Sequence, residues 1–342
     1  MSDSTKIQWT DATWNPVTGC TKVSAGCANC YAERDWPRHY GRQTVPVDPG
    51  VGSPPPGYEF ERRPRRFTDV RCHQERLDEP LRWKKPRRVF VNSMADLFHD
   101  DVPDEFISAV FATMAQARAH TFQILTKRPK RMRELLQAWQ RSGLTLREGH
   151  GCVLPNVWLG VSAEDQATAD ERIPILLDTP AAVRFVSAEP LLGPIEFEGA
   201  AAVDGSGVGQ PYLEGLDWAI VGGESGPKSR PCDVAWIHSI VEQCGEAGVA
   251  CFVKQLGAVP FEQASCRADE PQGTDAALME LGGPSSLRQR AMMATGWTFV
   301  TSPDGTSCYQ RHWRLEDRKG GNPEEWPEDL RVREWPDAGG AS

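Results

Sequence analysis

Residues 88–126 read RVFVNSMADLFHDDVPDEFISAVFATMAQARAHTFQILT, and this stretch sets the fold class. Its first apolar run, residues 88–93, predicts a buried strand. Residues 103–119 carry apolar side chains three and four positions apart, which predicts a helix, and the second apolar run, residues 121–126, predicts another strand. Two apolar strands joined through a helix are typical of parallel pairing, with both faces of the sheet covered.

The same alternation continues on both sides of this stretch. Further strands are expected at residues 6–16, 157–162, 183–187, 216–222 and 250–255, and further helices at residues 129–140, 165–177 and 235–247. About seven strand–helix units favour the α/β class, as a partial or full (β/α) TIM-type barrel with parallel strands. A doubly wound open sheet is the alternative.

Irregular regions interrupt the expected barrel and follow it. We expect the barrel over residues 1–257, with insertions at about 44–85 and 196–214. Prolines crowd the first insertion, and glycine and alanine are frequent in the second. Residues 258–342 lack the strand–helix rhythm, so a C-terminal extension or lid is expected there.

Polar side chains follow nearly every expected strand. The carboxyl ends of parallel strands meet at one edge of the sheet, where both architectures place function. We therefore expect a polar, charged mouth that contains Ser93, Asp96, Lys127, Arg128, Ser162, Glu164, Glu189, Glu224 and Lys254. The candidate catalytic residues among them are Lys127, Arg128, Glu189, Glu224 and Lys254.

Three cysteines follow the first expected strand with the spacing C-x6-C-x2-C, namely Cys20, Cys27 and Cys30. Thiols this close in sequence can converge on one point, and a three-ligand site leaves one coordination position open. The alternatives are a zinc site completed by His39 or Cys72, a disulfide, and an iron–sulfur cluster. We favour the cluster, because thiolates are its usual ligands and neither His39 nor Cys72 belongs to a second paired half-site.

Composition limits the function classes. The net charge of -9 over 342 residues argues against a wholly basic protein that coats nucleic acid. There is no apolar run near eighteen residues, and residues 1–6 lack the apolar core of a signal peptide. We therefore expect no membrane association and a cytoplasmic location, where the ten cysteines are free thiols or metal ligands.

Two further features have two readings each. Eleven Lys and Arg residues lie between Arg62 and Arg88, and they form either a phosphate-binding face or a solvated, partly paired surface. Tryptophans of the C-terminal region either stack on a nucleic-acid base or fill the core; they are Trp297, Trp313, Trp326 and Trp335.

The motif set as a whole resembles the radical S-adenosylmethionine enzymes. Within that group it is similar to a phage- and prophage-encoded three-cysteine-motif family, over most of the chain. The motifs that carry the resemblance are Trp14-Asn15-Pro16 with Gly19-Cys20, Cys27-Ala28-Asn29-Cys30-Tyr31-Ala32, residues 90–99 (FVNSMADLFH), residues 125–129 (LTKRP), residues 187–194 (SAEPLLGP), residues 222–227 (GGESGP) and residues 317–321 (DRKGG).

The resemblance implies a [4Fe–4S] cluster held by Cys20, Cys27 and Cys30, with S-adenosylmethionine chelating the fourth iron. One electron from the cluster then cleaves the sulfonium and releases methionine and a 5′-deoxyadenosyl radical, which abstracts a substrate hydrogen. The six-residue first gap is longer than the common C-x3-C-x2-C spacing, and Ser93-Met94-Ala95-Asp96 stands where such enzymes often have Gly-Gly-Glu.

By the same resemblance, roles follow for the mouth residues. The expected cofactor-binding residues are Tyr31 for the cluster or adenine, Ser93 and Asp96 for the methionine ammonium, and Ser162 and Glu164 for the ribose. Lys127 or Arg128 would bind the methionine carboxylate. Expected partners are a reductant such as flavodoxin or ferredoxin, a nucleic-acid or nucleotide substrate, and a partner protein. The alternative function is a zinc-stabilised module that binds nucleic acid or protein without redox chemistry.

Overall fold

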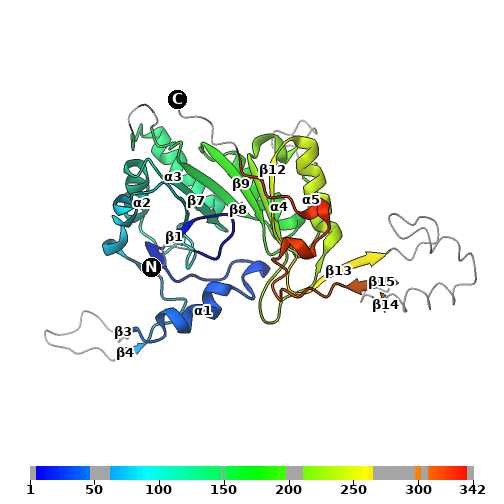
Figure 1. Ribbon diagram of the computed structural model, residues 1–342. Coiled ribbons are helices and arrows are strands. Elements are labelled where there is room, and N and C mark those ends of the chain that lie inside the picture. The colour runs from blue at the N-terminus through cyan, green and yellow to red at the C-terminus, as the bar shows by residue number, and fades with distance from the viewer. Residues whose placement is uncertain are drawn as a thin grey trace, which may run out of the picture.

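Seven parallel strands form one curled sheet in the order β1-β6-β7-β8-β9-β10-β12 (Figure 1). The computed structural model describes residues 5–46, 62–147, 149, 151–197, 211–264, 297–301 and 307–336. Neighbouring strands follow one another along the chain, without the reversal of strand order that marks a doubly wound sheet. The predicted partial TIM-type barrel is therefore confirmed.

Most barrel elements lie close to their predicted positions, but the strand expected at residues 6–16 is limited to residues 12–14, and the helix at residues 31–40 was not predicted. The strands are β1 Ala12–Trp14, β6 Arg88–Val91, β7 Thr121–Thr126, β8 Val157–Ser162, β9 Val183–Ala188, β10 Trp218–Gly222 and β12 Ala250–Gln255. The helices are α1 Tyr31–Tyr40, α2 Asp104–Gln116, α3 Pro129–Arg141, α4 Gln166–Leu177 and α5 Val234–Ala247. Local signals set several ends: Pro129 occupies the first turn of α3, Asp165 and Thr168 form a capping box, and Gly248 ends α5 with φ +67°.

The two faces of the sheet bury different side chains. Alternate residues on the outer face, such as Val89, Ile124 and Leu159, pack against the helices. The inner face carries a second cluster, which we call the aromatic layer: Trp9, Phe90, Trp158, Phe185, Trp218, Ile220 and Phe252. Most of these residues lie in the first half of their strands, so the layer fills the amino-terminal part of the barrel. Space for polar groups is left at the carboxyl edge.

Short strands and 3-10 helices lie outside the seven-stranded sheet. In the first predicted insertion, β3 Thr44–Pro46 pairs with β4 Arg62–Pro64, and β5 Arg71–Cys72 pairs with β2 Val17–Thr18; residues 47–61 lie outside the described residues. Most of the second insertion, residues 198–210, also lies outside them. The 3-10 helices are η1 Ala25–Cys27, η2 Gln74–Arg76, η3 Glu79–Arg82, η4 Tyr212–Gly215, η5 Pro323–Glu325 and η6 Glu328–Leu330.

The C-terminal region contributes to two parts of the fold. A second sheet has the order β11-β13-β15-β14, with β11 Cys232–Asp233, β13 Pro260–Ala264, β14 Trp297–Thr301 and β15 Ser307–His312. Further along, residues 332–334 run antiparallel to β12, where the Val253 amide donates to the Val332 carbonyl at 2.9 Å and the Glu334 amide donates to the Cys251 carbonyl at 2.8 Å. This tail segment covers the edge of the barrel sheet. The lid over the mouth stays a prediction.

The tryptophans of the tail pack internally where their side chains are described. Trp335 lies 5.0 Å from Phe252 between ring centroids, and its indole N–H donates to the Trp9 carbonyl at 3.4 Å. Trp326 is buried in the main core, and Trp313 is partly buried against it. Trp326 fills the core and the other two pack against it, which agrees with the second of the two readings. No helix in the described part of the chain is long and apolar enough to cross a membrane.

Candidate metal centre

The cysteine loop, residues 19–30, leaves β2 and enters α1 at the carboxyl edge of the barrel. Its backbone joins the segment after β6, because the Gly19 amide donates to the Met94 carbonyl at 3.1 Å. Gly19 has φ +94°, and a Cβ there would lie 2.7 Å from the carbonyl oxygen of Asp69. Only glycine fits this position, so the entry into the loop is fixed by its backbone.

All three loop cysteines are half-buried free thiols. Burial raises the pKa of Cys20 to about 11; the Asp96 carboxylate and Cys27 also raise it, while Arg128 lowers it. Burial likewise raises the pKa of Cys30, with a contribution from Cys27. Cys27 is therefore within electrostatic reach of both other thiols. Among the residues that the structure describes, no three His, Cys, Asp or Glu side chains are grouped around one point as a single metal ion would require.

One strand-end carboxylate, Asp96, holds a cation against Cys20. Asp96 is buried and accepts hydrogen bonds from the Thr126 hydroxyl at 2.8 and 2.9 Å and from the Lys127 amide at 3.1 Å. Its Oδ2 pairs with Nη1 of Arg128 at 3.2 Å. The same Nη1 donates to Sγ of Cys20 at 3.6 Å. We call this arrangement the Asp96 anchor.

A second carboxylate, Glu164, holds the middle of the loop. Its Oε1 accepts from Nζ of Lys127 at 2.5 Å and from the Ser24 hydroxyl at 3.0 Å, and its Oε2 pairs with Nη1 of Arg172 at 3.0 Å. Burial acts to raise the pKa of Glu164, but Lys127 and Arg172 hold it below its ordinary value of 4.5. Gly26 packs directly on this carboxylate, since a Cβ there would lie 2.3 Å from Oε1. This is the Glu164 anchor.

A third carboxylate, Glu224, holds the end of the loop after β10. Its Oε2 accepts from Nδ2 of Asn29 at 2.9 Å, and its Oε1 pairs with Nη2 of Arg230 at 2.6 Å. Nη1 of Arg230 reaches the Ala25 carbonyl of the loop at 2.9 Å. Burial acts to raise the pKa of Glu224, but the hydrogen bonds from Arg230 and Asn29 keep it below its ordinary value. With this Glu224 anchor, three ion pairs at the barrel edge are each hydrogen-bonded to the loop.

The remaining predicted residues fall into separate places. Lys254 at the end of β12 pairs with Glu189 after β9, with 2.9 Å between Nζ and Oε1. Tyr31 is 45% exposed, and its hydroxyl donates to the Ser93 carbonyl at 2.5 Å. Ser162 is buried, and its carbonyl accepts from Nη1 of Arg172 at 2.8 Å. The structure thus brings Lys127, Arg128, Asp96, Glu164 and Glu224 to the cysteine loop, whereas Glu189 and Lys254 form a pair of their own.

Sequence reasoning missed four residues of the anchors: Ser24, Asn29, Arg172 and Arg230. Only Arg172 carried a recognisable signal. It stands in the apolar stripe of α4 with Ala169, Ile173 and Leu176, and a charged residue in a buried stripe requires a partner.

The basic segment from Arg62 to Arg88 is largely engaged with its own fold. Arg65 is buried and donates to the Thr18 carbonyl at 2.9 Å, and Arg63 pairs with Asp69 at 2.6 Å. Arg88 pairs with Asp11 at 3.3 Å. The segment matches the partly paired surface more closely than a free phosphate-binding face.

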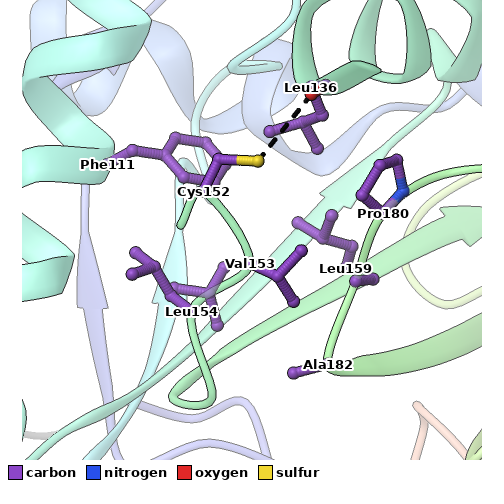
Figure 2. A pocket seen from close by; sticks show the side chains of 10 residues that line it. Phe111, Leu136, Cys152, Val153, Leu154, Leu159, Pro180 and Ala182 are labelled. Carbon is purple, nitrogen blue, oxygen red and sulfur yellow. Dashed lines mark hydrogen bonds between the residues drawn. The ribbon is translucent and has the colours of Figure 1, made fainter. Parts of the chain in front are cut away.

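Two pockets differ greatly in size and place. The first, of about 10 Å³, lies between apolar side chains on the outer face, and Cys152 there donates its thiol to the Leu136 carbonyl at 3.9 Å (Figure 2). It has room for roughly one water molecule and no ligand. The second, of about 250 Å³, adjoins the cysteine loop at Val23 and is lined by Asp100, residues 127–131 and Glu171.

The curled parallel sheet and the anchored loop together define a partial (β/α)-barrel protein with three thiols at its mouth. The chain belongs to the family described as Protein of unknown function (DUF5131), whose model matches residues 4–298. Among solved structures, the chain is similar to a mutant of spore photoproduct lyase, with a TM-score of 0.37 and 10% sequence identity; the alignment covers 92% of this chain and 72% of that chain. No curated protein sequence matches this chain.

Proposed function

We propose that this protein is a radical S-adenosylmethionine enzyme that binds a [4Fe–4S] cluster through Cys20, Cys27 and Cys30. The observation that carries the proposal is the placement of the loop. Three free thiols lie on one loop at the carboxyl edge of a parallel barrel, and three ion pairs of the barrel edge hold that loop through hydrogen bonds.

The chemistry of the donor set fits such a cluster. Each ligating sulfur of a four-iron cluster binds a different iron, so the three thiols need not meet at one point. Three protein ligands leave one iron for another ligand, and the Arg128 guanidinium supplies a hydrogen bond of the kind that cluster sulfurs accept. When bound, the cluster and S-adenosylmethionine supply one-electron cleavage of the sulfonium, which yields methionine and a 5′-deoxyadenosyl radical.

The mouth residues divide into two groups under this proposal. Asp96, Glu164 and Glu224 position the loop, because their oxygens already accept hydrogen bonds from Lys127 and Arg230. Glu189 and Lys254 form an ion pair at the ends of β9 and β12. Lys254 could pair with the carboxylate of an amino acid and Glu189 with its ammonium group. We assign them to the bound amino acid moiety or to the substrate.

We further propose a nucleotide or a nucleic-acid base as the substrate class, for a phage-type modification. The support is the pocket of about 250 Å³ beside the cysteine loop, to which Lys127, Lys130 and Arg131 contribute cationic side chains beside the carboxylates Asp100 and Glu171. A base within a duplex would have to leave the helix to reach the barrel mouth. The reductant would be a low-potential electron carrier such as flavodoxin or ferredoxin, in the cytoplasm, and a partner protein could present the substrate.

Anaerobic reconstitution with iron and sulfide tests the proposal. The wild-type chain should become brown, hold about four irons per chain, and release 5′-deoxyadenosine from S-adenosylmethionine after reduction with dithionite. Replacement of Cys27 by Ala should abolish cluster binding while far-UV circular dichroism stays unchanged, since Cys27 lies outside the core clusters.

Cys72→Ala is the matched control, because Cys72 is a half-buried free thiol near the loop that is not assigned to the cluster. It should retain iron and activity. A colourless wild-type chain with one tightly held zinc, lost in Cys72→Ala, would establish the zinc-stabilised binding module instead.

A further inference from the structure

One cysteine of the loop has a buried cation beside its sulfur. Nη1 of Arg128 lies 3.6 Å from Sγ of Cys20, and Nη2 donates to the carbonyl and the hydroxyl of Thr21 at 3.1 and 2.9 Å. The Arg128 side chain is only 9% exposed. The guanidinium therefore reaches the loop through both of its terminal nitrogens and has little contact with water.

The strand end that carries Arg128 also fixes its direction. Asp96 accepts from Arg128, from the Lys127 amide and from the Thr126 hydroxyl, so it binds three consecutive residues at the end of β7. An additional hydrogen bond from the Phe98 amide, at 3.0 Å, holds the carboxylate itself. A guanidinium held in this way is not free to turn toward a ligand in the barrel.

We propose that Arg128 is a positioning residue that raises the reduction potential of the cluster by donating a hydrogen bond to Cys20, and that it does not bind the carboxylate of S-adenosylmethionine. This inference rests on the proposed function. Reduction adds one negative charge to the cluster, and no bond is formed or broken in that step. A nearby cation in a poorly hydrated site favours the more negative form, and hydrogen bonds to the sulfurs act in the same direction.

The test is a potentiometric titration of reconstituted protein, with dithionite as the one-electron reductant and electron paramagnetic resonance as the readout. In Arg128→Gln the midpoint potential should fall by about 59 mV, which is a tenfold change in the ratio of oxidised to reduced cluster. In Asp96→Asn the potential should rise, because a negative charge behind the guanidinium is removed while an oxygen acceptor remains. Arg133→Gln, on the helix α3 that follows Arg128 and paired with Asp178 at 3.5 Å, should match the wild type.

Opposite shifts of the midpoint potential in the two variants distinguish an effect of charge from an effect of structural damage. A structural disturbance alone would move both potentials in the same direction. Equal potentials in Arg128→Gln and the wild type, with a full cluster in each, would overturn the inference and leave the proposed function standing. Absence of a cluster in the wild type would overturn the proposed function itself. If Arg128→Gln holds no cluster, Asp96→Asn decides alone, and a potential in that variant that equals the wild-type value or lies below it would overturn the inference.

Discussion

At the scale of single residues, the buried carboxylates of the mouth were found from the sequence, but their partners were not. Asp96, Glu164 and Glu224 were recognisable because polar residues directly follow apolar strands. Arg172 and Arg230 approach them from elsewhere in the fold, and Asn29 lies inside the loop. Such pairings depend on three-dimensional packing. A single sequence therefore predicts the carboxylate but not the residue that pairs with it.

Glu164 provides a test of this ionic packing. Its side chain is 1% exposed and pairs with both Lys127 and Arg172. Glu164→Gln should lower the free energy of unfolding by about 3–5 kcal/mol, because it leaves a buried cation without its partner. The pKa of Glu164 is lowered in the folded chain, so its contribution is present above pH 4.5 and is lost as the pH falls further. The variant should therefore lose stability less steeply in acid than the wild type, as measured by urea unfolding at several pH values.

The control is Glu171→Gln, on helix α4, which begins two residues after Glu164. Glu171 pairs with Lys130 at 3.3 Å, but both side chains are more than half exposed. Exposed pairs contribute less than about 1 kcal/mol, so little change is expected. An equal loss of stability in both variants would show that burial of Glu164 is not the cause.

At the scale of elements, prediction succeeded where the signal was local. The strands β7, β8 and β12 begin and end at the predicted residues, since each is a short apolar run bounded by polar residues or turns. The two-residue strands β2, β5 and β11 were missed, because such strands exist only through pairing with distant segments. The tail segment along β12 was missed for the same reason.

The tail segment makes a prediction at this scale. Trp335 contacts Phe252, and the Arg88 guanidinium lies 4.6 Å from its ring centroid. Trp335→Ala should lower the free energy of unfolding by roughly 2 kcal/mol, below the value for a fully buried tryptophan because the side chain is only half-buried. Chemical denaturation gives the value. Leu81→Ala, at a site that is 45% exposed, should change stability by less than about 0.5 kcal/mol.

At the scale of the whole molecule, the barrel core and the candidate metal centre are separate. The aromatic layer and the outer core do not include the loop cysteines among their buried residues. Removal of iron from reconstituted protein by a chelator should therefore leave the far-UV circular dichroism unchanged. The melting temperature should shift only by the binding contribution of the cluster.

A chain that unfolds when iron is removed would contradict this separation and would indicate that the metal organises the fold, as in small zinc-dependent domains. Protein prepared without iron is the control, and its circular dichroism should match that of the chelated sample.

The aromatic layer has a consequence for the way ligands would enter and leave the barrel under the proposed function. Trp9 and its neighbours fill the amino-terminal part of the described barrel, so ligands reach its interior from the carboxyl edge. Ligands that enter the barrel at this edge also leave it there. Under the proposed function, a ligand that binds deepest would bind before the others and leave after them, so steady-state kinetics should show an ordered sequence of binding and release.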